Sequence, residues 1–214
     1  MSQPNRRYAS AVRDEQAALT RRRVVQAAAA RFHAEGYSAT TVAAVARDAA
    51  VSAQTVYNTF GTKAALLKAA YDVTLAGDDA DVPLAQRPEV QALYAESDAA
   101  VFLRGYAALG RTVVERVGPL MLLIAAGADA GDPDLVEIRD TTDQERLVGT
   151  SMVVGKVADL GALSPDLTRE AARDRIWTLN SVQVWHLLTG RGWTGDEYAA
   201  WIGDAMCAAI LADH

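Results

Sequence analysis

The chain has 214 residues, of which 50% are hydrophobic and 22% charged, with a formal net charge of −6. This length allows one large or two small domains, each with a buried core. Its single cysteine, Cys207, excludes an internal disulfide and a thiolate zinc site and fits a reducing compartment. The N-terminus lacks the apolar segment of a signal peptide, and no apolar run reaches the ~18 residues of a membrane span. We therefore expect a cytoplasmic protein.

Charge is distributed unevenly along the chain. Of the 21 basic and 27 acidic residues, the first 63 positions hold nine basic and four acidic, a net of +5. The remaining positions therefore hold 12 basic and 23 acidic residues, a net of −11. A basic segment before an acidic body is typical of a nucleic-acid-binding unit joined to a second function. Solvated helix faces would produce the same asymmetry, so the charge alone leaves both interpretations open.

The first elements follow from periodicity and helix-stop signals. Residues 1–12 are polar and aperiodic, which predicts a flexible arm. Within it, Arg6 and Arg7 either reach a minor groove or belong to an ordinary disordered tail. Apolar residues at helical spacing predict a helix over about 13–35, and Gly36 ends it as a residue suited to positive φ.

Two short helices joined by a tight turn are predicted next. Thr40 can cap a helix whose Val42 and Val45 face inward, and Ser52 can cap a second helix that buries Val56. This is the pattern of a helix-turn-helix, in which the second helix enters the major groove of DNA and the first crosses the backbone.

The exposed side chains of this segment suit the two kinds of DNA contact. Hydroxyls of Thr41 and Tyr57 and the ammonium of Lys63 are expected at phosphates, which position a protein without reading sequence. Amides and a hydroxyl on the second helix are expected at base edges, where an amide pairs bidentately with adenine. The predicted DNA-binding residues are Thr40, Thr41, Ser52, Ala53, Gln54, Thr55, Tyr57, Asn58 and Lys63.

These residues resemble the TetR family of transcriptional regulators. The resemblance runs from about Arg23 to Leu67 and rests on the ordered set Phe32-His33-Ala34-Glu35-Gly36-Tyr37, Thr40-Thr41-Val42, Val51-Ser52, Thr55, Tyr57, Phe60, Lys63 and Leu66-Leu67. The chain has Ala50 where the family usually has glycine in the turn, and Gln54 where glycine or alanine is common. A positive φ at Ala50 would cost roughly 1 kcal/mol. The resemblance implies a DNA-binding regulator that dimerises through its last two long helices.

The rest of the chain is divided by prolines that can open helices. We place a domain boundary near residue 62, with a DNA-binding domain over 13–62 and a ligand-binding and dimerisation domain over 63–214. The helix over 62–75 is expected to belong mechanically to both. Further helices are predicted over about 88–117, 118–126, 132–160, 164–188 and 195–211, the last after the capping-box spacing of Thr194 and Glu197. No segment has a strand pattern, so the fold class is all-α with about nine helices.

The last two predicted helices are apolar on more than one side. Such helices need cover all round, so one face can pack on the domain and the other on a second copy of the chain. This agrees with the resemblance, although a wholly intramolecular core remains the alternative. The predicted dimer-interface residues are Trp185, Leu188, Tyr198, Trp201, Ile202, Ala205 and Ala209.

The acidic half also has residues suited to an apolar ligand chamber with a few orienting polar groups. An apolar or aromatic effector is favoured, because a domain of net −11 holds anions less readily. The same residue types at helical spacing also form ordinary cores, and we interpret His186 and Cys207 as structural. The candidate pocket residues are Tyr94, Phe102, Tyr106, Met121, Leu122, Trp177, Asn180 and Gln183.

Motifs of catalysis are missing from the sequence. It has no glycine-rich phosphate loop, no nucleophile elbow and no His-Glu pair at metal spacing, so we expect neither an enzyme nor a cofactor or metal. The sequence predicts a homodimeric TetR-like repressor that binds a palindromic operator on double-stranded DNA and releases it when a small molecule fills the C-terminal domain. The alternative is an all-α ligand-binding or interaction protein without specific operator recognition, which Ala50 slightly favours.

Overall fold

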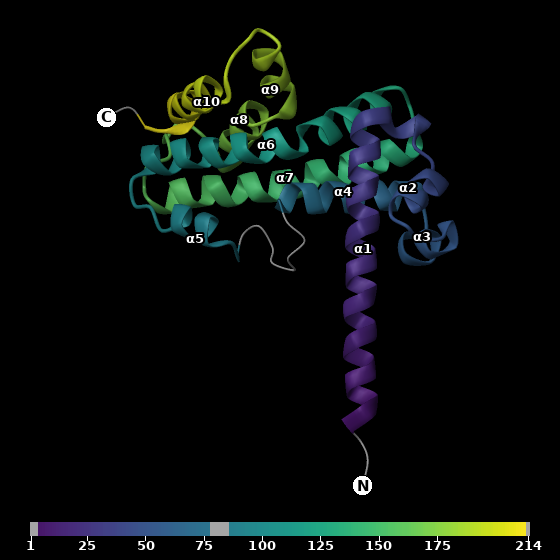
Figure 1. Cartoon of the computed structure of the whole chain (residues 1–214). Helices are drawn as coiled ribbons and strands as arrows, with labels where there is room; N and C mark the ends of the chain where they lie inside the picture. The colour runs from purple at the N-terminus through teal and green to yellow at the C-terminus, as the bar shows by residue number, and fades with distance from the viewer. Residues whose placement is uncertain (1–3, 78–85, 213–214) are drawn as a thin grey trace. The chain divides into compact units, whose positions relative to one another are not determined.

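The computed structural model describes residues 4–77 and 86–212, with side chains from residue 14 onward. The described residues form helices and no strand, apart from one isolated antiparallel bridge between Leu163 and Leu211, which confirms the all-α fold class (Figure 1). Contacts divide the chain into two compact units, Met1–Asp79 and Ala80–His214. The helices are α1 (Pro4–Ala39), α2 (Val42–Asp48), α3 (Ala53–Phe60), α4 (Lys63–Ala76), α5 (Pro88–Tyr94), α6 (Ala99–Asp129), α7 (Pro133–Asp159), α8 (Arg169–Leu179), α9 (Val182–Thr189) and α10 (Gly195–Ile210).

The first unit differs from the sequence prediction at both of its ends. Residues 1–3 of the expected arm lie outside the described residues, but the chain is helical from Pro4, so the expectation of an arm is wrong for residues 4–12. Proline at the start and a run without glycine suit helix formation there. At the other end, α4 packs on α1 and buries Leu66 and Leu67, so the contacts group it with the first unit.

Hydroxyl caps begin each short helix of the first unit. The side chains of Thr41, Ser52 and Thr62 accept hydrogen bonds from the backbone N–H groups three residues later, at the starts of α2, α3 and α4. Gly36 has φ 78° and ψ 176° inside α1, which confirms its predicted role in ending the regular helix. The buried residues of this unit include Val24, Val25, Ala28, Phe32, Val45, Val56, Leu66 and Leu67.

The helical segments of the second unit lie where the sequence predicts them, but the breaks between helices fall at other residues. The expected helix over 88–117 ends at Tyr94, and a new one begins after Asp98, whose carboxylate accepts from Val101 N at 2.9 Å. Pro119 does not open a helix but lies inside α6. Buried Val117 and Leu120 beside it offset the hydrogen bond that an internal proline removes.

The predicted helix over 164–188 is two helices, α8 and α9. Asn180 leaves the helical conformation with ψ 37°, and the Ser181 hydroxyl caps α9. Arg146 of α7 stabilises this break, because its Nη2 donates to the carbonyls of Trp177 and Asn180 at 3.2 and 3.1 Å. Carbonyls at a helix end lack partners within the helix, and an arginine is well suited to satisfy them.

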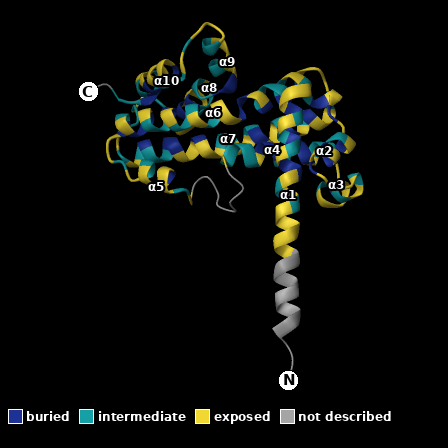
Figure 2. Cartoon of the chain, viewed as in Figure 1, coloured by how far each residue is buried: buried dark blue, intermediate teal, exposed yellow. Residues whose placement is uncertain are grey.

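The core of the second unit lies where α10 packs along α6, with α7 and α8 completing it (Figure 2). The capping box at Thr194 is present as predicted, and Asp132 caps α7. Within the described part of the chain, no helix is long and apolar enough to cross a membrane. The fully buried side chains of this core are Phe102, Leu103, Ala107, Val153, Val157, Ala172, Ile176, Ile202, Met206 and Ile210.

Candidate nucleic-acid interface

The turn between α2 and α3 has the tight geometry of a helix-turn-helix. Ala50 N donates to Arg47 O at 3.1 Å and Val51 N to Ala46 O at 2.9 Å, which closes the end of α2. Ala50 has φ 54°, and among the described residues it alone reaches positive φ without being glycine. This is the conformation for which a cost of roughly 1 kcal/mol is expected.

The recognition helix, α3, presents one face to the core and another to solvent. Val56 is its one buried residue, and Phe60 is half-buried with the Arg21 guanidinium 4.7 Å from its ring centre. On the outer face, Tyr57 is 49% exposed, and Gln54 Nε2 donates to Asn58 Oδ1 at 2.8 Å. This leaves Gln54 Oε1 free to accept and Asn58 Nδ2 free to donate, the two functions that pairing with a base edge requires.

Two of the predicted hydroxyls are partly used in capping α3. Ser52 Oγ accepts from Thr55 N at 3.0 Å, and the hydroxyls of Ser52 and Thr55 are 2.8 Å apart in a shared hydrogen bond. One hydroxyl hydrogen of the pair therefore remains for another partner. Thr55 is half-buried, so it is less available to a base edge than expected, while Ala53 lies half-buried at the start of the helix.

The structure contradicts the predicted roles of Thr40 as a helix cap and a DNA-binding residue. Its side chain is 1% exposed, and its hydroxyl donates to Gly36 O at 2.8 Å. It therefore neither caps α2 nor faces DNA. Thr41 has that place, since it is exposed and its hydroxyl accepts from Ala44 N at 3.1 Å. Its own O–H can still donate to a phosphate.

Lys63 is also placed differently from the prediction. Its ammonium donates to Tyr37 O at 2.8 Å and to Thr40 O at 3.2 Å, and it lies 4.0 Å from the centre of the Tyr37 ring. The side chain is thus directed at carbonyls of the first unit, while the contact of Lys63 with phosphate stays a prediction.

Other cations of the first unit divide between internal and exposed roles. Arg31 of α1 binds both Asp48 and Glu35, and the Asp48 hydrogen bond raises the pKa of Arg31 while lowering that of Asp48. Arg47, in the last turn of α2, is exposed with only a long 3.8 Å contact to Asp48. Arg47 is not among the predicted DNA-binding residues, although its place opposite the buried Val42, Val45 and Ala46 marks it as a candidate phosphate contact.

The candidate pocket residues of the second unit form a packed cluster rather than an open chamber. Asn180 Nδ2 donates to Tyr106 Oη at 3.2 Å, and the rings of Tyr94 and Phe102 meet edge to face at 5.3 Å. Burial raises the pKa of Tyr106, and it raises the pKa of Tyr94 to about 12. Phe102 belongs to the core, whereas Met121 and Leu122 are half-buried on α6 and Gln183 is exposed on α9. The structure therefore brings only part of the predicted set together.

Trp177 is the member of this set with an unsatisfied polar atom. Its indole Nε1 is buried and has no hydrogen-bond partner, and the Arg146 guanidinium lies 4.8 Å from its ring centre. A buried donor without an acceptor costs roughly 1–3 kcal/mol. An acceptor on a bound molecule would remove that cost.

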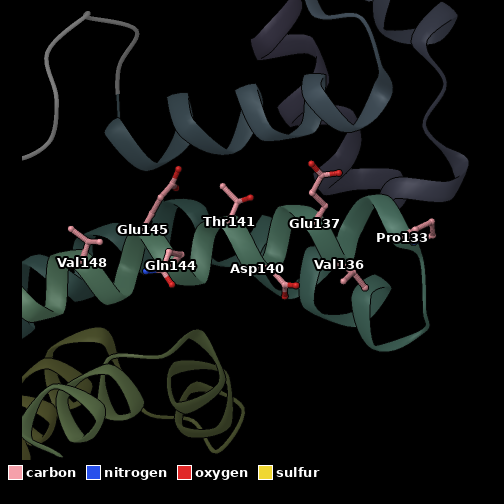
Figure 3. Close-up of a pocket in the computed structure, with 8 residues that line it drawn as sticks. All are labelled: Pro133, Val136, Glu137, Asp140, Thr141, Gln144, Glu145 and Val148. Carbon is pink, nitrogen blue, oxygen red and sulfur yellow. The ribbon is translucent and has the colours of Figure 1, made fainter. Parts of the chain in front are cut away.

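The hollow that the structure shows in the second unit lies elsewhere. It has a volume of about 720 Å³, is open to solvent, and contains none of the predicted pocket residues. Figure 3 shows that the side chains lining it all come from α7, and they are Pro133, Val136, Glu137, Asp140, Thr141, Gln144, Glu145 and Val148. A shallow surface on one helix cannot enclose a small molecule as a ligand site does.

Several predicted interface residues belong to the core of their own unit. Tyr198 and Ile202 are 1% and 0% exposed, so their prediction as interface residues is wrong. Trp185 packs edge to face on Tyr198 at 4.8 Å, and Leu188, Ala205 and Ala209 are half-buried. Cys207 Sγ lies 3.8 Å from Ala100 O, and burial raises the pKa of its thiol, consistent with a structural role.

Trp201 remains available for an interface. It is 44% exposed on α10. Leu187, which is not among the predicted interface residues, is 67% exposed on α9. The Trp193 and Trp201 rings meet edge to face at 5.9 Å, so part of the exposed indole is held in place.

Residues 24–70 match the family model of bacterial regulatory proteins, tetR family. The match covers α2 and α3, the C-terminal part of α1 and the N-terminal part of α4. A comparison with curated protein sequences gives no match.

Solved structures extend the similarity to about 90% of the chain at the level of the fold. A putative TetR-family transcriptional regulator from Rhodococcus sp. is 16% identical, with a TM-score of 0.70, over 90% of this chain and 98% of its own. A putative transcriptional regulator from Saccharomonospora viridis in complex with choline is 18% identical, with a TM-score of 0.68, over 90% and 98%. The complex of SmeT, the repressor of a Stenotrophomonas maltophilia multidrug efflux pump, with triclosan is 20% identical, with a TM-score of 0.67, over 91% and 92%.

Proposed function

We propose that the protein is a TetR-family transcriptional regulator and acts as a homodimeric repressor of a palindromic operator, because residues 24–70 match the tetR family model and the described chain has the fold of such regulators. A small molecule bound in the second unit would release it from DNA. A regulator acts where the DNA is, so the proposed location is the cytoplasm.

The observation that supports operator reading is the outer face of α3. Its Gln54–Asn58 amide pair and exposed Tyr57 stand opposite the single buried residue Val56. A pair of linked amides is a direct-readout element, since amide groups discriminate bases in the major groove by roughly 1–3 kcal/mol each. Exposed Thr41, the cap of α2, and exposed Arg47, in its last turn, would hold the adjacent phosphates.

Selection from a pool of duplexes with a random central segment tests this function. The wild-type chain should enrich one sequence with twofold symmetry, because a symmetric dimer places two identical reading helices on two half-sites. The variant with both Gln54→Ala and Asn58→Ala should enrich a different sequence or none. If the wild-type chain enriches no sequence, operator reading is wrong and the alternative of an interaction protein stands.

For the dimer, we propose a face centred on Trp201 and Leu187. Both are large, apolar and exposed on neighbouring helices near the end of the chain, which suits an isologous contact. The half-buried Ala205 would allow close approach between helices there.

For the effector, we propose an apolar or aromatic molecule that also carries a hydrogen-bond acceptor. The buried Nε1 of Trp177 supplies the unused donor, and Tyr106 and Asn180 lie near the same break between α8 and α9. The structural neighbours bind choline and triclosan, which makes these two compounds suitable first probes.

Calorimetric titration of both probes, with and without the selected duplex, tests the release mechanism. Coupling between two binding sites is reciprocal. If an effector lowers the affinity of the protein for DNA by a given factor, DNA must lower the affinity for the effector by the same factor. A typical coupling of about 1–3 kcal/mol corresponds to roughly 5- to 150-fold. A probe that binds equally with and without DNA is not the effector.

A further inference from the structure

The ammonium of Lys63 lies between the two ends of the helix-turn-helix. Thr40, whose carbonyl it contacts at 3.2 Å, immediately precedes Thr41, the cap of α2. Lys63 itself is the first residue of α4 and follows α3 after only Gly61 and Thr62. One side chain therefore joins the backbone just before the helix-turn-helix to the backbone just after it.

The groups around the Lys63 ammonium favour a cation that remains bound to them. Gly36 interrupts α1 at φ 78°, and the carbonyls of Tyr37 and Thr40 converge on the Lys63 ammonium. The Tyr37 ring adds a cation–π contact at 4.0 Å. Tyr37 and Thr40 are both buried, and Lys63 is half-buried. Carbonyl dipoles near a helix end attract a positive charge, more strongly when water is largely excluded.

The recognition helix has few other attachments that would fix its orientation. It has only eight residues, and Val56 is its one buried side chain. Its other apolar contact is partial, since Phe60 is half-buried under the Arg21 guanidinium, so contacts at the ends of the helix contribute to where its outer face points. At its C-terminal end the chain turns through Gly61 at φ 78° and enters α4, where Lys63 is fixed.

We propose that Lys63 is a positioning residue that sets the orientation of α3, and thereby the sequence specificity of the protein, rather than a phosphate contact. Its two carbonyl partners fix the distance between the entry and the exit of the helix-turn-helix. This inference rests on the proposed function as an operator-binding protein. It extends that function by naming a specificity determinant outside the recognition helix.

The two possible roles of Lys63 differ in how DNA affinity depends on salt. A lysine that neutralises a phosphate contributes about 0.9 to the slope of log affinity against log salt concentration, and its loss weakens operator and random DNA alike. A positioning lysine leaves the slope unchanged, because it releases no counterion. Its loss misaligns Gln54 and Asn58 and therefore weakens operator binding selectively.

The experiment measures the affinity of the full-length chain for the selected duplex and for a shuffled duplex over a range of salt concentrations. Lys63→Met keeps the aliphatic stem and removes the charge. Lys68→Met is the matched control, because Lys68 lies on the same helix and pairs with Asp72 at 2.6 Å, away from the carbonyl site. Lys63→Met should lower the operator-to-random ratio at least tenfold, on the order of one lost base contact, with an unchanged salt slope. Lys68→Met should leave that ratio unchanged.

Lys63→Arg separates the roles even if Lys63→Met fails to fold. Arginine keeps the charge, so a phosphate contact would survive, whereas its planar fork cannot replace a compact ammonium between two carbonyls and a ring. The ratio should fall for Lys63→Arg as well. An unchanged ratio, or an equal loss on both duplexes with a slope lower by about one, overturns the proposal. A lower melting temperature with an unchanged ratio also overturns it and leaves a purely structural lysine.

Failure of this proposal is distinguishable from failure of the proposed function. If the wild-type chain selects no duplex, operator reading itself is wrong. If it selects one and the Lys63 variants retain the wild-type ratio, the protein reads an operator but Lys63 does not position the reading helix.

Discussion

Gln54 and Asn58 are linked across one turn of α3 by a hydrogen bond of 2.8 Å from Gln54 Nε2 to Asn58 Oδ1. Each amide therefore orients the other. Asn58 accepts this bond through Oδ1 and keeps the N–H donors of Nδ2, while Gln54 keeps its oxygen as an acceptor. The pair offers a fixed order of acceptor and donor along the helix.

We predict that Gln54 and Asn58 act as one unit in binding the selected operator. Gln54→Ala and Asn58→Ala should each lower operator affinity, and the double variant should lose less than the sum of the two, because either single change already releases the remaining amide. Residues in direct contact couple by about 0.5–3 kcal/mol in such cycles. Fluorescence anisotropy with the operator and a shuffled duplex measures this. Additive losses would show that the two amides act independently.

The positive φ of Ala50 predicts that its substitution by glycine increases the stability of the protein. Ala50→Gly should raise the free energy of unfolding by roughly 0.5–1 kcal/mol, because glycine adopts φ 54° without the clash that Cβ causes. The matched control is Ala43→Gly, an exposed position inside α2, which should lower stability by about 1 kcal/mol. Urea denaturation followed by circular dichroism gives both values. Destabilisation by Ala50→Gly would mean that the alanine methyl makes packing contacts worth more than the backbone strain.

The exposed apolar side chains of α9 and α10 predict where dimerisation can be broken. Leu187→Glu and Trp201→Glu should give folded monomers or weakened dimers, since a charge buried on association without a partner costs several kcal/mol. Ile202→Glu is the contrasting variant, because Ile202 is in the core of its own unit and its loss should unfold the chain. Light scattering together with circular dichroism separates the two results. Intact dimers from both surface variants would place the interface elsewhere.

The unpartnered indole nitrogen predicts a specific effect on effector binding. Trp177→Phe keeps an aromatic ring but removes the Nε1 donor, so effector affinity should fall roughly 2- to 10-fold, as expected for one hydrogen bond of about 0.5–1.5 kcal/mol. Trp193→Phe is the control, since that ring packs on Trp201 instead. Calorimetry with the bound probe measures both. If binding by Trp177→Phe equals wild type, the indole donor has no part in effector recognition.

The capping box of α10 predicts a pH dependence of stability. Hydrogen bonds from the Thr194 backbone and hydroxyl, at 2.7 and 2.8 Å, lower the pKa of Glu197 from its ordinary 4.5. A carboxylate with a lowered pKa in the folded state stabilises the fold above the unfolded pKa, and this contribution is lost as the pH falls through the folded pKa. Glu197→Gln should therefore melt below the wild type at neutral pH and approach it in acid. A difference that stays constant with pH would contradict this.

Local sequence signals determined much of the secondary structure of this protein. Hydroxyls before apolar runs fix the starts of α2 and α3, and Gly36 and the Thr194–Glu197 box act within a few residues of themselves. The all-α class and the helix-turn-helix follow from such short-range preferences, whereas the positive φ at Ala50 runs against the local preference of alanine. These features depend on backbone conformations that neighbouring residues impose directly, so they can be predicted from the sequence alone.

Tertiary structure decided the roles of residues whose partners are distant in sequence. Lys63 finds Tyr37 and Thr40 more than twenty positions earlier, and Arg146 finds Trp177 and Asn180 more than thirty positions later. Thr40 and Thr41 are adjacent and chemically identical, yet burial assigns one to the core and the other to the surface. A polar side chain serves whichever acceptor or donor the folded chain brings within reach, and helix packing, rather than residue type, sets that partner.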